Sequence, residues 1–318
     1  RNGIDRKTGD YNEFWAGRDY LNDMKPMKAA LFMSHGFNDW NVMPEHSYRI
    51  YNAAEEMGLP AKIYYHQYGH GGPPPISMMN RWFTKYLFGI DNGAEKGPKA
   101  YIVRENDKND NPTAYENYPN PDAEDVTLYL QKDGRKVGLL NTEKIKKQGK
   151  QTLIDDYTLS GDSLAQLANS DHRLLFVTPI LKEDIHLSGL STLTIKLASS
   201  KPAANLSVWM VSLPWNKDKK AKMTENIITR GWADPQNHKS LTESEPLKPG
   251  KFYELSFDLI PDDQVIPAGQ QIGLMIFSSD NKFTLLPKPG TELTIDLDET
   301  SIEIPVVGGK EVFEKATN

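Results

Sequence analysis

Two side chains in the first quarter of the sequence could cooperate in proton transfer. Asp39 lies in the segment 36–40 (GFNDW), and His70 lies in the segment 68–72 (YGHGG). A carboxylate that accepts a hydrogen bond from the Nδ1–H of a histidine holds the imidazole in one tautomer. The Nε2 atom of that imidazole can then take a proton from a nucleophile. The pair therefore predicts the acid and the general base of a nucleophilic hydrolase.

Each of these residues also has a simpler interpretation. Asp39 could cap its own loop before Asn41, because Asp and Asn favour turns through local hydrogen bonds. His70 could be an ordinary turn histidine. Two further histidines compete for the role of base. We expect His35, at the end of a strand, to be a packed or hydrogen-bonded neighbour, and His66, inside a strand, to be structural.

The spacing of His66 and His70 also raises the question of a metal site. Two histidines four residues apart share one face of a helix, but the glycines and prolines that follow His70 argue against a helix there. No Glu follows His66, as the helical metalloprotease motif requires. The sequence therefore predicts no metal and no cofactor.

The sequence contains no credible nucleophile for this acid and base. The motif G-x-S-x-G is absent, and the two nearest segments, 161–165 (GDSLA) and 189–193 (GLSTL), lack the final glycine and follow His70. In α/β-hydrolases the triad runs Ser, Asp or Glu, then His along the chain. The first residue here is Arg1. We therefore expect the serine upstream of residue 1, and this carboxyl-terminal portion to be inactive alone.

The elements around the pair follow a β-α-β-α order. An apolar run at 29–33 without alternation predicts a strand buried on both faces, as in a parallel sheet, and a second strand is expected at 61–66. Helices are expected from Pro44 to Gly58 and from 76 to 88. This order is typical of a parallel α/β sheet. Residues 25–95 are therefore expected to form the carboxyl-terminal end of an α/β-hydrolase domain.

The segment before this unit is expected to be helical. Residues 1–24 contain the sequence 10–21 (DYNEFWAGRDYL), in which Asp10 could cap a helix with Glu13 at capping-box spacing. Two strands alone would leave a long apolar edge, which favours association. We expect a preceding part of the protein to complete the sheet.

The character of the sequence changes after Gly89. Residues 89–125 are rich in polar residues, Pro, Gly and Asn, and are expected to form a linker and an irregular loop. Ten short β-like runs follow and predict a jelly-roll β-sandwich domain over residues 96–318. The runs begin at residues 126, 137, 174, 192, 206, 227, 252, 271, 283 and 293. The fold class expected for the chain is thus α/β plus all-β.

Composition limits the possible partners. The chain has 318 residues, enough for about two domains, and its net charge of −6 argues against nucleic-acid binding. The Lys-rich stretches 144–150 (KIKKQGK) and 217–222 are expected on solvated loops. No apolar run approaches the roughly 18 residues that span a membrane. Cysteine is absent, which fits a cytoplasmic protein.

Several segments of the chain resemble one family. The segments 11–21, 28–72, 174–200, 228–235 and 246–280 resemble the Xaa-Pro dipeptidyl-peptidases of the lactic-acid-bacterial type. The most specific parts are DWNV at 39–42, GHGG at 69–72 and the β-rich blocks, and the resemblance covers essentially the whole chain.

The resemblance implies a serine peptidase that releases Xaa-Pro dipeptides from the free amino terminus of peptides, as a cytoplasmic homodimer. It implies Asp39 as the triad acid and His70 as the base. The nucleophile and the oxyanion hole would lie upstream, and no residue in this chain shows proline specificity.

Two alternatives to this function stay open. Related enzymes with the same carboxyl-terminal part act on esters or transfer acyl groups, so an ester or acyl hydrolase is the first alternative. The second treats the β-rich half as a carbohydrate-binding module, with Trp209, Trp215 and Trp232 as a stacking platform. Tryptophan in a β-sandwich is more often part of the core. We therefore favour a domain that supports the catalytic part.

Overall fold

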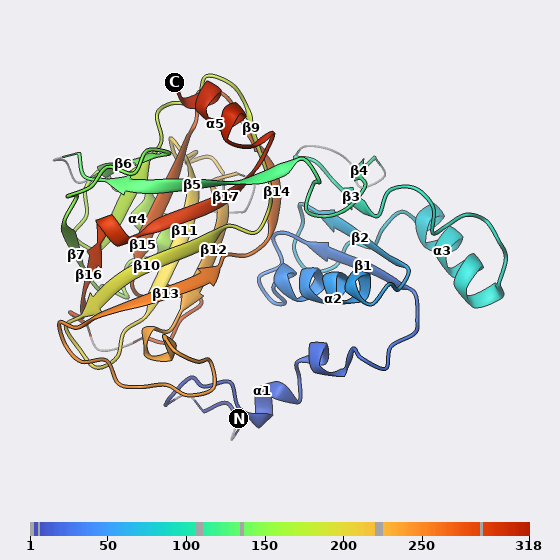
Figure 1. The fold of residues 1–318 in the computed structure, drawn as a ribbon, viewed down its shortest axis with the longest axis horizontal. Coiled ribbons are helices and arrows are strands. Elements are labelled where there is room, and N and C mark those ends of the chain that lie inside the picture. Colours follow the sequence, from blue (N-terminus) through green and yellow to red (C-terminus); the bar gives the residue numbers. More distant parts are fainter. Residues whose placement is uncertain (1–2, 6, 106–110, 134–136, 220–224, 287–288) are drawn as a thin grey trace.

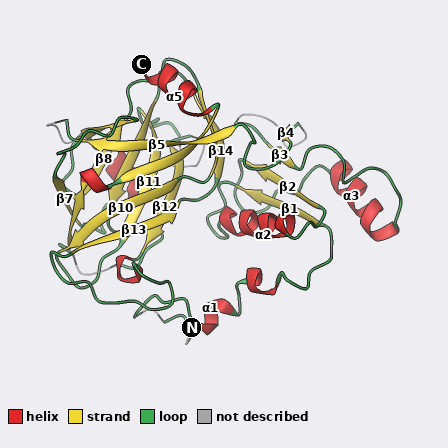
Figure 2. Cartoon of the chain, viewed as in Figure 1, coloured by secondary structure: helices red, strands yellow, loops and turns green. Residues whose placement is uncertain are grey.

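Two β-sheets form two adjacent parts of the molecule (Figure 1). The structure, a computed structural model, describes residues 3–5, 7–105, 111–133, 137–219, 225–286 and 289–318. The smaller sheet carries helices beside it, and the larger is almost entirely strands and loops (Figure 2). The predicted combination of an α/β part with a β-rich part is confirmed. The linker residues 106–110 and the Lys-rich residues 220–222 lie outside the described residues.

The smaller sheet has the strand order β1-β2-β3-β4. Its elements are β1 (Leu31–Gly36), α2 (Pro44–Glu56), β2 (Ala61–His66), α3 (Ile76–Phe88), β3 (Ala100–Ile102) and β4 (Thr113–Tyr115). β1, β2 and β3 are parallel, and β4 is antiparallel to β3. The predicted β-α-β-α order is therefore confirmed. α2 begins with proline at its first turn, where the missing N–H costs nothing.

Two expectations for this part were wrong, and the exposure of one helix was not anticipated. Residues 31–35 of β1 are only partly buried, because β1 is an edge strand of the described sheet, whereas β2 is buried throughout. Residues 89–125 are not only a linker, since β3 and β4 extend the sheet to Tyr115. The apolar stripe of α3 is mostly exposed. Trp82 is buried, but Ile76 is 80% and Leu87 is 71% exposed.

The amino-terminal helix is shorter than expected. It comprises α1 (Glu13–Ala16), and a separate 3₁₀ turn, η1, follows at Tyr20–Asp23. The side chain of Asn12, not Asp10, caps α1 by accepting a hydrogen bond from the Phe14 N–H. Asp10 instead accepts a hydrogen bond from the side chain of Asn237, so this segment lies against the β-rich part.

The larger sheet contains thirteen strands in the described residues. They are β5 (Ala123–Gln131), β6 (Val137–Asn141), β7 (Lys150–Ile154), β8 (Arg173–Val177), β9 (Ile185–Gly189), β10 (Thr192–Ser199), β11 (Leu206–Leu213), β12 (Ile227–Ala233), β13 (Phe252–Asp258), β14 (Asp262–Ile266), β15 (Gln271–Phe277), β16 (Glu292–Asp296) and β17 (Ser301–Val307). The short helices α4 (Gly161–Gln166) and α5 (Gly309–Thr317) and the 3₁₀ turns η2 (Pro235–Asn237) and η3 (Leu297–Glu299) accompany them.

This sheet contributes side chains to a large apolar core and to a second, smaller one. Its main path is β12-β11-β15-β8-β6-β5-β17-β10-β16-β7, with β13 paired to β10 and β9 joining β14 to β17. Side chains from strands far apart on this path share a single core cluster, for example Leu128, Ile195, Leu274 and Ile304. Burial of this apolar surface is the main stabilising contribution to such a domain.

Nine of the ten predicted runs are strands in the described part of the chain. The run at 283–286 is wrong. Phe283 lies in a turn, where its N–H donates to the carbonyl of Asp280. Its ring packs on Trp40, which lies in the loop after β1. β7, β9, β14 and β17 were not expected.

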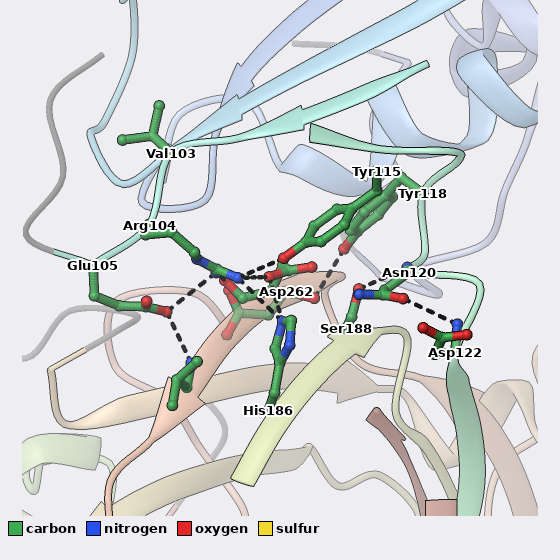
Figure 3. A network of polar contacts seen from close by, with 12 residues as sticks. Val103, Arg104, Glu105, Tyr115, Tyr118, Asn120, Asp122, His186, Ser188 and Asp262 are labelled. Atoms are coloured by element: carbon green, nitrogen blue, oxygen red, sulfur yellow. Dashed lines mark hydrogen bonds and ion pairs between the residues drawn. The ribbon is translucent and has the colours of Figure 1, made fainter. Parts of the chain in front are cut away.

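A buried ionic network joins the two parts (Figure 3). Arg104, which follows β3, lies with its Nη1 2.5 Å from Oδ1 of Asp263, and its Nη2 donates to the Asp263 carbonyl at 2.7 Å. The same guanidinium donates to the hydroxyl of Tyr115. His186 on β9 contacts the same carboxylate at 2.9 Å. Asp263 is fully buried, so the network fixes β14 against β3 and β4.

Asp262 lies beside this network, and its carboxyl group is buried. Within the described residues neither of its carboxyl oxygens has a hydrogen-bond donor. Burial raises the pKa of Asp262 well above its usual range, with the Asp263 charge adding to the effect. Its backbone carbonyl, by contrast, accepts from the hydroxyl of Tyr118. Burial therefore favours the protonated form of Asp262, which lies next to the carboxylate that Arg104 contacts.

Candidate active site

The loops after β1 and β2 lie together at the carboxyl edge of the smaller sheet. Because the two strands are parallel, their carboxyl ends meet at the same edge. The Phe37 N–H donates to the His66 carbonyl at 2.9 Å. A Cβ on Gly36 would lie 2.1 Å from the backbone oxygen of Tyr68. Only glycine permits this approach, which places Asp39 and His70 on adjacent loops.

The carboxylate of Asp39 is buried and accepts several hydrogen bonds. Its Oδ1 accepts from the N–H groups of Asn41 and Val42 at 2.9 and 3.1 Å. Its Oδ2 lies 2.8 Å from Nδ1 of His70. Burial by itself raises the pKa of Asp39, but the hydrogen bonds from Val42, His70 and Asn41 together outweigh it and lower that pKa. The loop cap and the contact with histidine thus use different oxygens of one carboxylate.

His70 presents its other nitrogen to an open space. Its side chain is 67% exposed, and no described residue hydrogen-bonds its Nε2. The recess beside it is lined by Ser34, Gly36, Val42 and Pro73 among others. An imidazole held at Nδ1 and free at Nε2 has the geometry of a general base.

His66 supports the loop that carries His70. It is fully buried, and its Nδ1 accepts a hydrogen bond from the Tyr68 N–H at 3.1 Å. Burial lowers its pKa, so the ring stays neutral near pH 7. Gly72 has a φ of 95°, and a Cβ there would lie 2.6 Å from Nε2 of His66. The structure therefore gives His66 the structural role that its place in a strand indicated.

His35 is a hydrogen-bonded neighbour, as expected. Its Nε2 lies 2.9 Å from the Val42 carbonyl and 3.3 Å from Oδ2 of Asp39. Its Nδ1 lies 2.5 Å from Oγ of Ser47 on α2. Sequence reasoning missed Ser47, because a serine on the inner face of a helix carries no signal in the sequence.

The serines considered in the sequence are engaged in the β-rich part. Ser163 is within α4, and its N–H donates to the hydroxyl of Ser160, the cap of that helix. Ser191 is buried between β9 and β10. Among the described residues, no group of three or more His, Asp or Glu side chains has an arrangement that could hold a metal ion.

The loop that carries Asp39 also contacts the β-rich part. The guanidinium of Arg230 on β12 lies 4.2 Å from the ring centroid of Trp40 and 4.4 Å from that of Phe283. A cleft of about 540 Å³ is lined by Trp40 and Tyr68 from the loops and by Trp215 and Lys282 from the β-rich part, among others. Trp40, the residue next to Asp39, is therefore held by contacts with the β-rich part.

The three tryptophans do not form one exposed platform. Trp209 is 2% exposed, and its indole N–H donates to Oδ2 of Asp280 at 3.1 Å. The indole N–H of Trp232 donates to the same oxygen at 3.2 Å. These two residues are parts of a buried cluster, which favours a supporting role over sugar stacking.

A parallel β-α-β unit with a hydrogen-bonded acid and histidine at its carboxyl edge, followed by a large β-rich part, defines a chain of mixed α/β and β-rich architecture. The fold agrees with two solved structures. An aminopeptidase from the marine sediment archaeon Thaumarchaeota archaeon has a TM-score of 0.71 at 16% identity, with 96% of this chain and 61% of that chain covered. An alpha-amino acid ester hydrolase has a TM-score of 0.69 at 15% identity, covering 96% and 60%.

The chain belongs to the X-Pro dipeptidyl-peptidase family. Residues 3–72 match the X-Pro dipeptidyl-peptidase (S15 family), and residues 92–317 match the X-Pro dipeptidyl-peptidase C-terminal non-catalytic domain. The resemblance to this family stated from the sequence is thereby confirmed.

Curated relatives carry the same name. A Rhodopirellula baltica protein named "Putative Xaa-Pro dipeptidyl-peptidase" is 57% identical over 305 residues, covering 96% of this chain and 49% of that protein. The "Xaa-Pro dipeptidyl-peptidase" of Lacticaseibacillus rhamnosus is 29% identical over 347 residues, covering 95% and 42%. The chain thus spans about half the length of the curated relatives it matches. In the described residues, no helix is both long and apolar enough to cross a membrane.

Proposed function

We propose that this chain is the part of a serine-type X-Pro dipeptidyl-peptidase that supplies the acid and the base of a Ser-His-Asp triad. The observation that carries the proposal is the 2.8 Å contact between Nδ1 of His70 and the buried carboxylate of Asp39, with Nε2 left unpartnered by the described residues. The serine is supplied by a preceding part of the same protein, in the order Ser, Asp, His.

In this mechanism Nε2 of His70 takes the proton of the serine hydroxyl as the oxygen attacks the carbonyl carbon of proline at the second position. The imidazolium then gives that proton to the leaving amine, and the Xaa-Pro dipeptide stays on the serine as an ester. A water molecule, deprotonated by the same nitrogen, then attacks the ester carbon; the bond to the serine oxygen breaks, the imidazolium returns the proton to that oxygen, and the dipeptide is released as its free acid. Asp39 stays ionised throughout and stabilises the imidazolium, which its lowered pKa supports.

The β domain, residues 96–318 by prediction, supports the catalytic loops in this proposal. Its contacts with Trp40 through Arg230 and Phe283 favour that role. The jelly-roll topology, the homodimer and the cytoplasmic location implied by the resemblance stay predictions.

The proposal is tested by hydrolysis of a chromogenic Xaa-Pro anilide. We expect the chain alone to be inactive, and to gain activity when the preceding part of the protein is added. In the complete enzyme His70→Ala should lower kcat on the order of 10³-fold or more. His46→Ala, which removes an exposed histidine from α2, is the matched control and should be neutral.

Three results would contradict the proposal. Near-normal turnover by the His70→Ala enzyme would remove the histidine from the mechanism. Strong turnover by the chain alone would mean that a serine within it acts as the nucleophile. Turnover of simple esters without turnover of Xaa-Pro anilides would instead assign the protein to ester hydrolysis.

A further inference from the structure

A second imidazole lies beside the carboxylate of Asp39. Nε2 of His35 is 2.9 Å from the carbonyl oxygen of Val42 and 3.3 Å from Oδ2 of Asp39, and the His35 side chain is 9% exposed. A carbonyl and an ionised carboxylate only accept hydrogen bonds. If Nε2 carried no proton, its lone pair would face these two acceptor oxygens at close range, which is repulsive. The geometry therefore requires a proton on Nε2 of His35.

Ser47 contacts the opposite nitrogen of the same ring. Its Oγ lies 2.5 Å from Nδ1 of His35, and the residue is 5% exposed on α2. A hydroxyl can donate or accept. It donates to Nδ1 if His35 is neutral and accepts from Nδ1 if the ring is charged. In both states the proton on Nε2 is retained, and the ring is held from both ends.

We propose that His35 is a positioning residue for the reaction, held in place by Ser47. This inference depends on the proposed roles of Asp39 and His70. Oδ2 of Asp39 is the oxygen that His70 contacts at 2.8 Å. The Nε2–H of His35 lies between that same oxygen and the Val42 carbonyl oxygen, and both can accept from it. Since Oδ1 is already held by two backbone N–H groups, His35 completes the fixation of the carboxylate plane.

The same contacts explain why His35 does not act as the base. Both of its nitrogens are occupied, at 2.5 and 2.9 Å, whereas His70 has one nitrogen free of protein contacts in the described residues. Two histidines thus share one carboxylate, with one exposed for proton transfer and the other enclosed.

The tautomer of His35 is the first test. ¹⁵N-labelled histidine in the 318-residue chain reports by NMR which ring nitrogen carries the proton, and the His35→Gln spectrum assigns the signal. We expect a protonated Nε2 on His35 and a protonated Nδ1 on His70. A neutral His35 with its proton on Nδ1 would overturn the proposal without any variant.

A pair of substitutions is the second test. His35→Leu removes the donor, whereas His35→Gln can place an amide N–H near the position of Nε2. We expect the Nδ1–H population of His70 to fall in the Leu variant and to recover in the Gln variant. Ser47→Ala should act in the same direction as His35→Leu, with a smaller effect.

In the complete enzyme the Leu variant should lose about 10- to 100-fold in kcat with little change in KM, because misplacement of a catalytic group by about 1 Å costs that much. The Gln variant should regain most of the loss. A folded Leu variant with normal kcat and an unchanged His70 tautomer would overturn the proposal.

The test can still be decided if the Leu variant does not fold, and its outcome can be distinguished from a failure of the proposed function. If the Leu variant does not fold, the proposal is judged on the His35 tautomer in the wild-type chain and on the effect of Ser47→Ala on the His70 tautomer. If His70→Ala keeps normal turnover, the proposed function fails, and that result is separate from the NMR measurement of His35.

Discussion

The ion pair between Arg104 and Asp263 should be a main connection between the two parts of the molecule. We predict that Arg104→Met destabilises the chain. The carboxylate of Asp263 is fully buried and the Arg104 side chain is 15% exposed, so the substitution leaves a buried charge without its cation. Such a change costs about 3–5 kcal/mol. His186 remains 2.9 Å from the same carboxylate, so we expect the lower end, about 3 kcal/mol.

This loss corresponds to roughly a 100-fold change in the folding equilibrium. Urea unfolding should be followed by tryptophan fluorescence and by far-UV circular dichroism, because two sheets can unfold in separate steps. If they do, we expect the unfolding midpoint of the smaller sheet to move to a lower urea concentration in Arg104→Met.

Two variants control the comparison. Arg49→Met removes an arginine whose contact with Glu45 is exposed, at 3.6 Å, and should cost less than about 1 kcal/mol. Adding Asp263→Asn to Arg104→Met removes the uncompensated charge and should recover part of the loss. If Arg104→Met is as stable as Arg49→Met, the network does not hold the two sheets together.

Two further predictions concern stability. Because burial raises the pKa of Asp262, the folded state holds a proton that the unfolded state releases above about pH 4, so the contribution of this group to stability falls as pH rises. Asp262→Asn should therefore gain in Tm relative to wild type between pH 4.5 and pH 8, and a pH-independent difference would contradict this. Gly36→Ala should lose about 1–3 kcal/mol, because its Cβ meets the backbone of Tyr68. Gly17→Ala, whose Cβ would be 3.4 Å from its nearest neighbour, should be almost neutral by the same thermal melt.

The loops of the site could be located from the sequence, but their contacts could not. Apolar runs followed by glycine-rich loops indicated where β1 and β2 end, and parallel strands bring such loops together. The 2.8 Å contact of His70 with Asp39 is consistent with that reasoning. The place of Ser47 depends on how α2 packs against β1, which no local pattern encodes.

The missed strands have specific physical reasons. β3 and β4 have three residues each within a polar stretch of sequence, and it is the pairing of β3 with β2 and of β4 with β3 that makes them strands. β14 begins with two aspartates, a pair typical of turns, and Arg104 provides the partner that permits Asp263 in a buried strand. β17 contains Pro305, which argues against a strand paired on both sides.

The position of β17 has a consequence for biosynthesis. This last strand pairs with β5, the first strand of the larger sheet, and also with β10 and β9. An interior strand of the sheet is therefore the last of its strands to be synthesised. β5 lacks its partner β17 during almost the whole synthesis of the domain. A stop codon shortly before residue 301 would remove an interior strand, not a dispensable tail, and should yield a product recognised by quality-control proteases.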